Sequence, residues 1–298
     1  MLKTALRYFI SVASHGSIRA ASGELNVAQS AVSRQLQSLE HDVGMTLFER
    51  RSRGVALTEA GELLFSFARS AMLDVDRLRS ELDELLGLER GHVRISTIET
   101  MVPLILPRAI NRFRSLHPRI TFTITIATTD EVVEAVQAGQ ADIGLGFSPI
   151  VGPEITLKYE RQEALLAVMS ASHPLASRAS VSIAEASAFP IALSPPRSGA
   201  RIVVDRACRE AGVKITPVLE SNSVELLHRF VMVGDGIAPL LRHTISESLH
   251  RGELTVVPFT EDAIAGTVTI MALDGRNLPL ASEKMASILA DELDTTHS

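Results

Sequence analysis

The amino-acid sequence predicts an all-α N-terminal domain with a β-hairpin, a long linker helix, and a C-terminal α/β domain of two lobes. Apolar residues recur at spacings of three and four up to residue 85, which is typical of amphipathic helices. From residue 92 onward, apolar β-rich runs alternate with helical stretches, which favours a sheet covered by helices. The length of 298 residues is sufficient for two or three compact units.

The changes of pattern near residues 60 and 91 give the expected domain organisation. We expect an N-terminal domain over residues 1–60, a linker helix with a hinge over 61–91, and a C-terminal domain over 92–298. In that last domain we expect lobe one to comprise residues 92–161 and 266–298, and lobe two to comprise 162–265.

Charge is divided unevenly along the chain. The net charge is −6, yet residues 1–60 contain seven Lys or Arg against five Asp or Glu, whereas the remainder contains 22 against 30. This division is expected of a protein that contacts nucleic acid only through its first domain. The composition, 46% hydrophobic and 21% charged, is otherwise that of an ordinary soluble globular protein.

The sequence predicts neither a membrane span nor an export signal. No apolar run approaches the ~18 residues that a spanning helix needs. The N-terminal residues are apolar and basic, as in an export signal, but they are spaced along one helical face with Arg7 among them. We therefore expect a cytoplasmic protein. The single cysteine, Cys208, excludes an intrachain disulfide and is interpreted as a packed residue, with redox sensing as the alternative.

Three short helices are predicted within the first forty residues. The first carries apolar residues at helical spacing. Ser17 can cap the second, Ile18–Leu25, which Asn26 ends. The third covers Gln29–Glu40 and has an apolar stripe of three residues, Val32, Leu36 and Leu39.

Polar residues of the third predicted helix fall largely outside its apolar stripe: Gln29, Ser30, Ser33, Arg34 and Gln37. A helix, a tight turn and a second helix that begins with hydrogen-bonding side chains form a helix-turn-helix, whose second helix enters the major groove of DNA. Gln and Arg suit base edges, and Ser can hold a phosphate. The alternative interpretation is the solvated face of an ordinary three-helix bundle.

A wing is predicted directly after these helices. The segment from Leu47 to Gly61 indicates a short strand, a basic turn that contains Gly54, and a returning strand. Arg50, Arg51 and Arg53 at the tip could reach backbone phosphates or the minor groove.

With these residues, the first domain resembles that of LysR-type transcriptional regulators. The shared positions run with intact spacing through Ala20-Ala21, Leu25, Gln29, Ala31-Val32-Ser33, Leu39-Glu40, Gly44, Leu47-Phe48-Glu49-Arg50 and Leu57-Thr58-Glu59-Ala60-Gly61. The resemblance implies a winged helix-turn-helix DNA reader. Three positions depart from it: Ser30 stands where the family often has proline, Gly23 lies within a helix, and Arg51 replaces a residue more often small or polar.

A helix of about thirty residues is predicted after Thr58, which can cap it. Its apolar positions follow spacings of three and four, as in a helix-pairing seam: Ala60, Leu64, Phe67, Ala71, Val75, Leu78, Leu82 and Leu85. The resemblance implies that this helix pairs with its copy in a second subunit of a dimer or tetramer. The alternative is a helix packed along its own C-terminal domain. Residues 87–91 would form the hinge.

The C-terminal part begins with a βαβαβ pattern, which predicts a parallel sheet with right-handed crossovers. Its elements are expected over His92–Ile98, Pro103–Leu116, Ile120–Ala127, Asp130–Ala138 and Ala141–Phe147. A second set of elements follows over residues 163–262, and the chain then returns through a strand, Ala265–Leu273, and a helix from Pro279 to about Asp291. This layout resembles the periplasmic-binding-protein-like effector domain of LysR-type regulators, with a cleft between two lobes.

Candidate effector-binding residues follow strand ends or precede helices: Thr100, Thr129, Phe147, Ser198 and Ser223. Ligands of open α/β sheets lie beyond the carboxyl ends of the strands, and helix N-termini favour anions. The alternative role for the Ser and Thr residues is helix capping. Arg197 could pair with a carboxylate or be solvated, and Glu99 would meet an amino group or an arginine. We expect a small polar effector, with a carboxylate that also carries an amine as the candidate.

The sequence contains no signal for catalysis, a metal or a cofactor. The nine histidines are scattered, and neither a G-x-S-x-G elbow nor a P-loop occurs. We therefore expect a ligand-responsive transcription regulator that binds double-stranded DNA at a two-fold-symmetric operator, not an enzyme. The runner-up is a cytoplasmic protein that binds a small solute without a DNA role, and an enzyme on the same scaffold ranks third.

Overall fold

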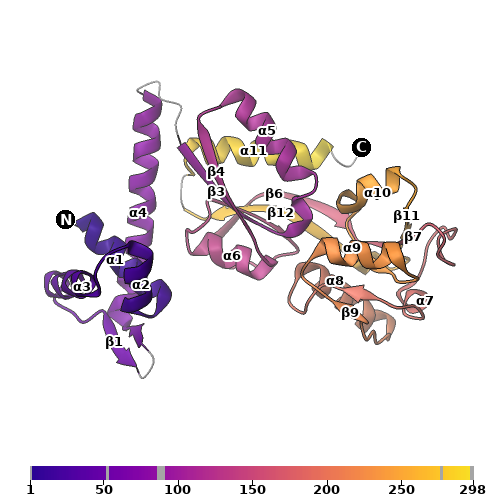
Figure 1. Ribbon diagram of the computed structural model, residues 1–298, viewed down its shortest axis with the longest axis horizontal. Coiled ribbons are helices and arrows are strands. Elements are labelled where there is room, and N and C mark those ends of the chain that lie inside the picture. Colours follow the sequence, from indigo (N-terminus) through magenta and orange to yellow (C-terminus); the bar gives the residue numbers. More distant parts are fainter. Residues whose placement is uncertain (1, 52–53, 86–90, 276–277, 296–298) are drawn as a thin grey trace. The chain divides into compact units, whose positions relative to one another are not determined.

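The computed structural model describes residues 2–51, 54–85, 91–275 and 278–295, in two units that comprise Met1–Leu82 and Asp83–Ser298 (Figure 1). The first unit contains α1 (Leu2–His15), α2 (Ile18–Leu25), α3 (Gln29–Val43), β1 (Phe48–Arg51), β2 (Gly54–Leu57) and most of α4 (Glu59–Leu85). None of the helices in the described residues combines the length and hydrophobicity needed to cross a membrane.

Local sequence signals set the boundaries of the first unit. The Ser17 hydroxyl accepts a hydrogen bond from the Ala20 N–H and begins α2, and Asn26 ends that helix in the left-handed conformation with φ 54°. The Thr58 hydroxyl accepts from the Gly61 N–H at 3.0 Å and begins α4. The predicted cap residues therefore occupy the ends of the helices at which they were expected.

The core of the first unit gathers residues from all of its helices. Phe9 and Val12 of α1 are fully buried, as is Leu47 just before the hairpin. On α3 the stripe of Val32, Leu36 and Leu39 is buried against them. The strands β1 and β2 pair antiparallel from Phe48↔Leu57 to Arg51↔Gly54, and so form the predicted hairpin.

The second unit consists of two lobes. Lobe one contains β3 (Gly91–Thr97), η1 (Glu99–Met101), α5 (Ile105–Leu116), β4 (Ile120–Ile126), α6 (Thr129–Gln137), β5 (Ile143–Phe147), β6 (Ile155–Ala164), β12 (Ala265–Leu273) and α11 (Leu280–Thr295). Lobe two contains β7 (Leu166–Ser170), α7 (Ile183–Ala186), β8 (Ala192–Leu193), α8 (Gly199–Ala211), β9 (Leu219–Glu220), α9 (Val224–Val233), β10 (Ala238–Leu240), η2 (Arg242–Ile245), α10 (Ser246–His250), β11 (Leu254–Pro258) and η3 (Asp262–Ile264).

The sheet of lobe one has the strand order β4-β3-β5-β12-β6. The pairs β3–β4 and β3–β5 are parallel, as predicted, whereas β12 is antiparallel to both β5 and β6, so the sheet as a whole is mixed. The helices α5 and α11 cover one face and α6 covers the other (Figure 1). Because β3 is parallel to both β4 and β5, the carboxyl ends of these three strands share one edge of the sheet.

Lobe two is inserted between β6 and β12. Its larger sheet is antiparallel with the order β10-β7-β11, and β8 and β9 form a short parallel pair. The helices α8 and α9 both contribute buried apolar residues to the packing of the unit. The chain leaves lobe one along β6 and re-enters it along β12, so two neighbouring strands connect the lobes.

The predicted helix Pro103–Leu116 is shorter in the structure than expected. The chain first makes the 3-10 turn η1, and α5 begins only at Ile105. Pro107 then lies in the first turn of α5, where a missing N–H costs no hydrogen bond. Pro103 lies just before the helix start, and Thr100 lies within the connecting turn η1.

Candidate functional site

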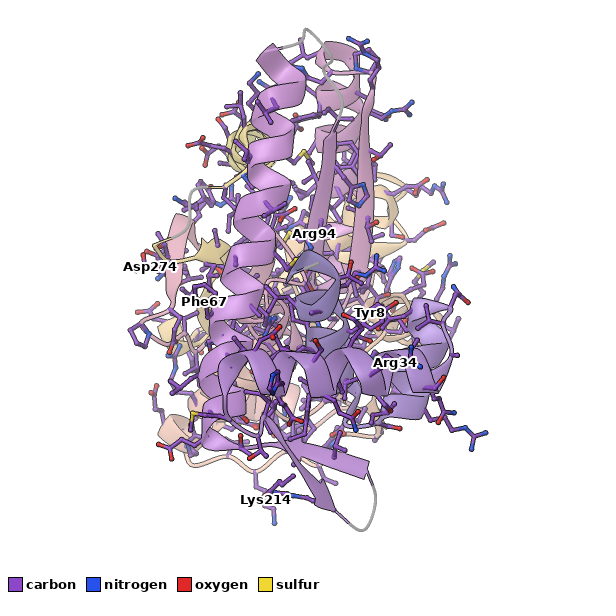
Figure 2. All side chains as sticks on the ribbon, turned by 90° about the vertical axis from the view of Figure 1, so that its left-hand side faces the viewer. Tyr8, Arg34, Phe67, Arg94, Lys214 and Asp274 are labelled. Carbon is purple, nitrogen blue, oxygen red and sulfur yellow. The ribbon has the colours of Figure 1, made fainter. Side chains whose placement is uncertain are left out.

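The exposed side of α3 carries most of the candidate DNA-contacting residues. Gln29, Ser30, Arg34 and Gln37 are exposed, and Ser33 is half-buried. They lie outside the buried stripe of α3, and Figure 2 labels Arg34 on this helix. Their amide, hydroxyl and guanidinium groups are the donors and acceptors that can read base edges and hold phosphates.

The structure describes the side chain of one of the three basic residues predicted for the wing, Arg51. Arg51 is exposed, and its guanidinium pairs with the Glu49 carboxylate at 2.7 Å. An exposed pair of this kind contributes little to stability, so a phosphate can take the place of Glu49. The side chain of Arg50 and the whole of Arg53 lie outside the described residues.

Glu40 joins α3 to the wing. Its Oε1 atom accepts hydrogen bonds from the Leu47 N–H at 2.7 Å and the Phe48 N–H at 3.2 Å. Two backbone donors at the start of β1 are thereby satisfied by the last turns of α3. The contact fixes the direction in which the hairpin leaves the candidate recognition helix.

A cavity of about 340 Å³ lies between the two lobes of the second unit. The five residues proposed from the sequence for effector binding all line it: Thr100, Thr129, Phe147, Ser198 and Ser223. The first three come from lobe one, at the carboxyl edge of its sheet, and the last two come from helix starts in lobe two. Apolar residues such as Ile98, Leu165 and Leu241 complete the walls.

The hydroxyl groups of lobe one differ in their hydrogen bonding. Thr129 is buried, and its Oγ1 donates to the Phe147 carbonyl at 3.4 Å. The Thr100 Oγ1 is buried without a hydrogen-bond partner among the described residues. A buried hydroxyl without a partner is costly, so Thr100 has an unused hydrogen-bonding group in the cavity wall.

In lobe two, the candidate serines are the N-caps of their helices. The Ser198 hydroxyl accepts from the Arg201 N–H at 3.2 Å at the start of α8, and the Ser223 hydroxyl accepts from the Leu226 N–H at 3.3 Å at the start of α9. Capping uses the acceptor side of each hydroxyl. The Ser198 O–H can still donate, whereas the Ser223 O–H already donates to Glu99 Oε1 at 3.3 Å. Capping and ligand contact are therefore compatible at Ser198, whereas donation from Ser223 to a ligand requires its O–H to turn away from Glu99.

Two charged side chains bridge the lobes, Arg197 outside the cavity lining and Glu99 within it. The Arg197 guanidinium pairs with the Asp130 carboxylate at 3.1 Å, although Arg197 is 80% exposed. Among the described residues, the hydrogen bonds of Glu99 are to the start of α9 and not to an arginine. Its carboxylate accepts from the Val224 N–H of α9 at 2.7 Å, since this helix start faces the turn after β3.

A buried polar network lies behind the cavity. His243 Nε2 is 3.0 Å from the Thr100 carbonyl oxygen, and His243 Nδ1 is 3.2 Å from Glu163 Oε1. Burial acts to raise the pKa of the Glu163 carboxyl, but the hydrogen bond and charge of His243, together with Arg161, lower it overall. Glu163 is therefore held as a carboxylate. The network connects a wall residue of the cavity to the strand β6 that joins the lobes.

Several residues in or near the cavity wall were not predicted from the sequence. Thr128 and Glu131 form a capping box at the start of α6, and the backbone and side-chain hydrogen bonds from Thr128 lower the pKa of the Glu131 carboxyl. The spacing Thr-x-x-Glu was a readable signal for this box. His243 and Glu163 had no local signal, because 80 residues separate them along the chain.

The structure adds little support for metal or redox chemistry. Within the part of the chain that the structure describes, no group of three or more His, Cys, Asp or Glu side chains is placed to hold a metal ion. Cys208 is buried, and burial raises the pKa of its thiol. A thiol with a raised pKa is a poor nucleophile, which favours the packed role over redox sensing.

Two family descriptions match the chain. One, a "LysR substrate binding domain", covers residues 86–294, and the other, a "bacterial regulatory helix-turn-helix protein, lysR family", covers residues 4–62. Among curated relatives, the transcriptional regulator BenM of Acinetobacter baylyi is 30% identical over 264 residues, which are 87% of this chain and 86% of BenM. Such relatives are named as regulators, in agreement with the expectation that the chain is not an enzyme.

Solved structures share the fold. A full-length OxyR variant from Pseudomonas aeruginosa has a TM-score of 0.71 and 22% identity, covering 98% of this chain and 94% of that chain. CbnR complexed with its target DNA has a TM-score of 0.60 and 21% identity, covering 99% of this chain and 100% of that chain. From the matched domains and the BenM relative, the chain belongs to the LysR family of transcriptional regulators.

Proposed function

We propose that this LysR-type regulator binds a two-fold-symmetric DNA operator in the cytoplasm and responds to a small polar effector in the cavity between its lobes. The observation that carries the proposal is the division of α3 into a buried stripe and an exposed polar side that includes Arg34. Such a division leaves base-reading side chains free to enter a major groove. The proposed contacts are Gln29, Ser30, Ser33, Arg34 and Gln37 from α3, with Arg50, Arg51 and Arg53 from the wing.

The cavity supports the effector half of the proposal. Its volume of about 340 Å³ is within the range that small-molecule sites occupy. Its walls are largely apolar, with the hydroxyl groups of Thr100, Thr129, Ser198 and Ser223 as orienting groups and Phe147 as one wall. A ligand that contacts both lobes can favour one interlobe arrangement and shift the population of the regulator.

Self-association is supported by α4. Large apolar side chains are exposed along it at helical spacing: Leu63, Phe67, Val75, Leu78 and Leu82. An exposed apolar row on a helix of 27 residues favours pairing with a second copy. We propose a dimer or tetramer, with domain boundaries near residues 60 and 91 and the two lobes divided as expected from the sequence.

A DNA footprint upstream of the regulator's own gene, measured at several salt concentrations, tests the function. We expect protection of a two-fold-symmetric site that weakens as salt rises, because phosphate contacts release counterions. If neither this region nor a genome-wide selection of bound fragments yields a site at low salt, the DNA-binding function is wrong. CbnR, which was solved with its target DNA and shares the fold, supplies a positive control for the assay.

A further inference from the structure

One contact across the cavity is made by an acidic side chain with a helix start. Glu99 lies on η1 in lobe one, directly after β3. Its Oε2 atom accepts from the Val224 N–H at 2.7 Å, and its Oε1 atom accepts from the Ser223 hydroxyl at 3.3 Å. The Glu225 N–H also lies 3.5 Å from Oε1. A single carboxylate in lobe one thus engages the first turn of α9 in lobe two.

The first turn of α9 is a favourable position for an anion. A helix of ten residues begins there, and its unsatisfied N–H groups and dipole attract negative charge. Ser223 already accepts from the Leu226 N–H, and Glu99 accepts from the N–H groups before it. The donors at this helix start are therefore satisfied by the chain itself.

The described lining of the cavity offers Glu99 no cationic side chain. Among the described residues that line the cavity, the charged ones are Glu99 and Glu131, and neither Lys, Arg nor His is present. Glu131 is engaged by Thr128 at the start of its own helix and does not cross to lobe two. Removal of the Glu99 carboxylate would leave the Val224 and Glu225 N–H groups without their acceptor. It would leave no positive side chain without a partner in this lining.

We propose that Glu99 is an internal anion that holds lobe one to the start of α9 and keeps other anions out of that position. The proposal rests on the function proposed above, since it defines which effector groups this cavity accepts. A carboxylate on the effector binds elsewhere in the cavity or displaces Glu99. If the effector displaces Glu99, a contact between the two lobes is replaced by a contact between the effector and α9. The packing of the lobes against each other is then weaker.

Chemical rescue of Glu99→Ala in the full-length protein tests this role, with acetate as the probe. We expect the variant to lose thermal stability and its α9 amides, followed by hydrogen exchange over residues 223–233, to exchange on the order of ten-fold faster. Sodium acetate should restore both properties in a saturable way, whereas sodium chloride at equal ionic strength should not. Wild type should not respond specifically to acetate, because Glu99 fills the position.

Glu131→Ala is the matched control, because it also removes a carboxylate that lines the cavity and caps a helix. It should leave exchange at the start of α9 unchanged. If Glu99→Ala keeps wild-type exchange at α9, Glu99 does not hold the lobes. If exchange rises but acetate and chloride act alike, the position does not select anions, and the proposal is wrong.

Glu99→Gln covers the case in which the alanine variant does not fold. It keeps the size of the side chain and removes the charge, so faster exchange at α9 is still expected, and wild-type exchange would overturn the proposal. None of these measurements uses DNA or an effector. A failed footprint would overturn the proposed function and leave the Glu99 result standing. Unchanged exchange at α9 would overturn the role of Glu99 and leave the proposed function standing.

Discussion

The α-carbon of Gly199 lies against the carbonyl group of Phe147, so close that an added Cβ atom would be 1.6 Å from the carbonyl oxygen. Gly199 begins α8 in lobe two, and Phe147 ends β5 in lobe one. Both residues line the cavity. The absence of a side chain at Gly199 thus allows the two lobes to meet at the cavity wall.

Gly199→Ala should therefore destabilise the C-terminal domain by about 1–3 kcal/mol, because the neighbouring atom is backbone and cannot rotate away. The measurement is the free energy of unfolding from urea denaturation. Gly23→Ala in α2 is the control, since nothing lies within 4 Å of the added methyl group. That variant should be more stable by up to about 1 kcal/mol. Equal stability of Gly199→Ala and wild type would contradict the close approach.

Glu163→Gln should reduce stability by about 1.5–3 kcal/mol at neutral pH, because it removes the charge that His243 and Arg161 contact. The pKa of Glu163 is lowered in the folded protein from its ordinary value of 4.5. Its carboxylate therefore stabilises the fold above that value, and the contribution is lost as the pH falls through the folded-state pKa.

The difference in unfolding free energy between wild type and Glu163→Gln should consequently shrink below pH 4.5. Denaturation curves over a pH series measure it. Glu160→Gln, at an exposed position on the same strand, is the control and should show a smaller difference at neutral pH. A difference that does not depend on pH would mean that the charge of Glu163 is unimportant.

Glu40→Ala should destabilise the N-terminal unit by about 1–3 kcal/mol, since the Leu47 and Phe48 N–H groups lose their acceptor. DNA affinity should also fall, because the wing is no longer fixed relative to α3. Thermal unfolding and fluorescence anisotropy with operator DNA measure the two effects. Asp42→Ala, an exposed acidic residue on the same helix, should change neither.

Phe67→Glu should weaken self-association by about 1.5–3 kcal/mol per copy, the cost of failing to bury one large apolar side chain. Phe67 is 64% exposed on α4, so the substitution leaves the fold of one chain intact (Figure 2). Size-exclusion chromatography with light scattering over a concentration series measures the change. Ser66→Glu adds the same charge at the adjacent exposed position and should have less effect. An unchanged oligomer would exclude α4 as the pairing surface.

Arg34→Ala should lower affinity for the operator by about 1–3 kcal/mol if the guanidinium reads a base, with stability unchanged within about 0.5 kcal/mol. Binding isotherms on operator and mutated operator DNA measure the loss of specificity. Arg114→Ala, an exposed arginine on α5, is the control and should bind as wild type does. If Arg34→Ala binds the operator with wild-type affinity, α3 is not the recognition helix.

Most of the first unit could be predicted because its signals are local. The caps Ser17 and Thr58 bond to residues three positions away, and the stripe of Val32, Leu36 and Leu39 lies within one helix. The cavity residues of lobe one could also be proposed from order alone, because parallel strands bring their carboxyl ends to one edge.

Contacts between the lobes could not be predicted in this way. Glu99 bonds to Val224, 125 residues away, and the Thr100 carbonyl meets His243 across 143 residues. An acidic side chain before a threonine carries no sign of which helix start will face it. Only the packing of lobe two against lobe one decides that partner, which explains why the contact of Glu99 with the start of α9 was not predicted from the sequence.

The position of β12 between β5 and β6 has a consequence for synthesis on the ribosome. The strand β6 contacts the sheet of lobe one only through β12, which follows lobe two in the chain. About a hundred residues are therefore synthesised between β6 and β12, its partner strand. At ribosomal rates this synthesis takes on the order of 5–20 seconds. During that interval one edge of β5 and both edges of β6 lack a partner strand, so lobe two is synthesised while the sheet of lobe one is still incomplete.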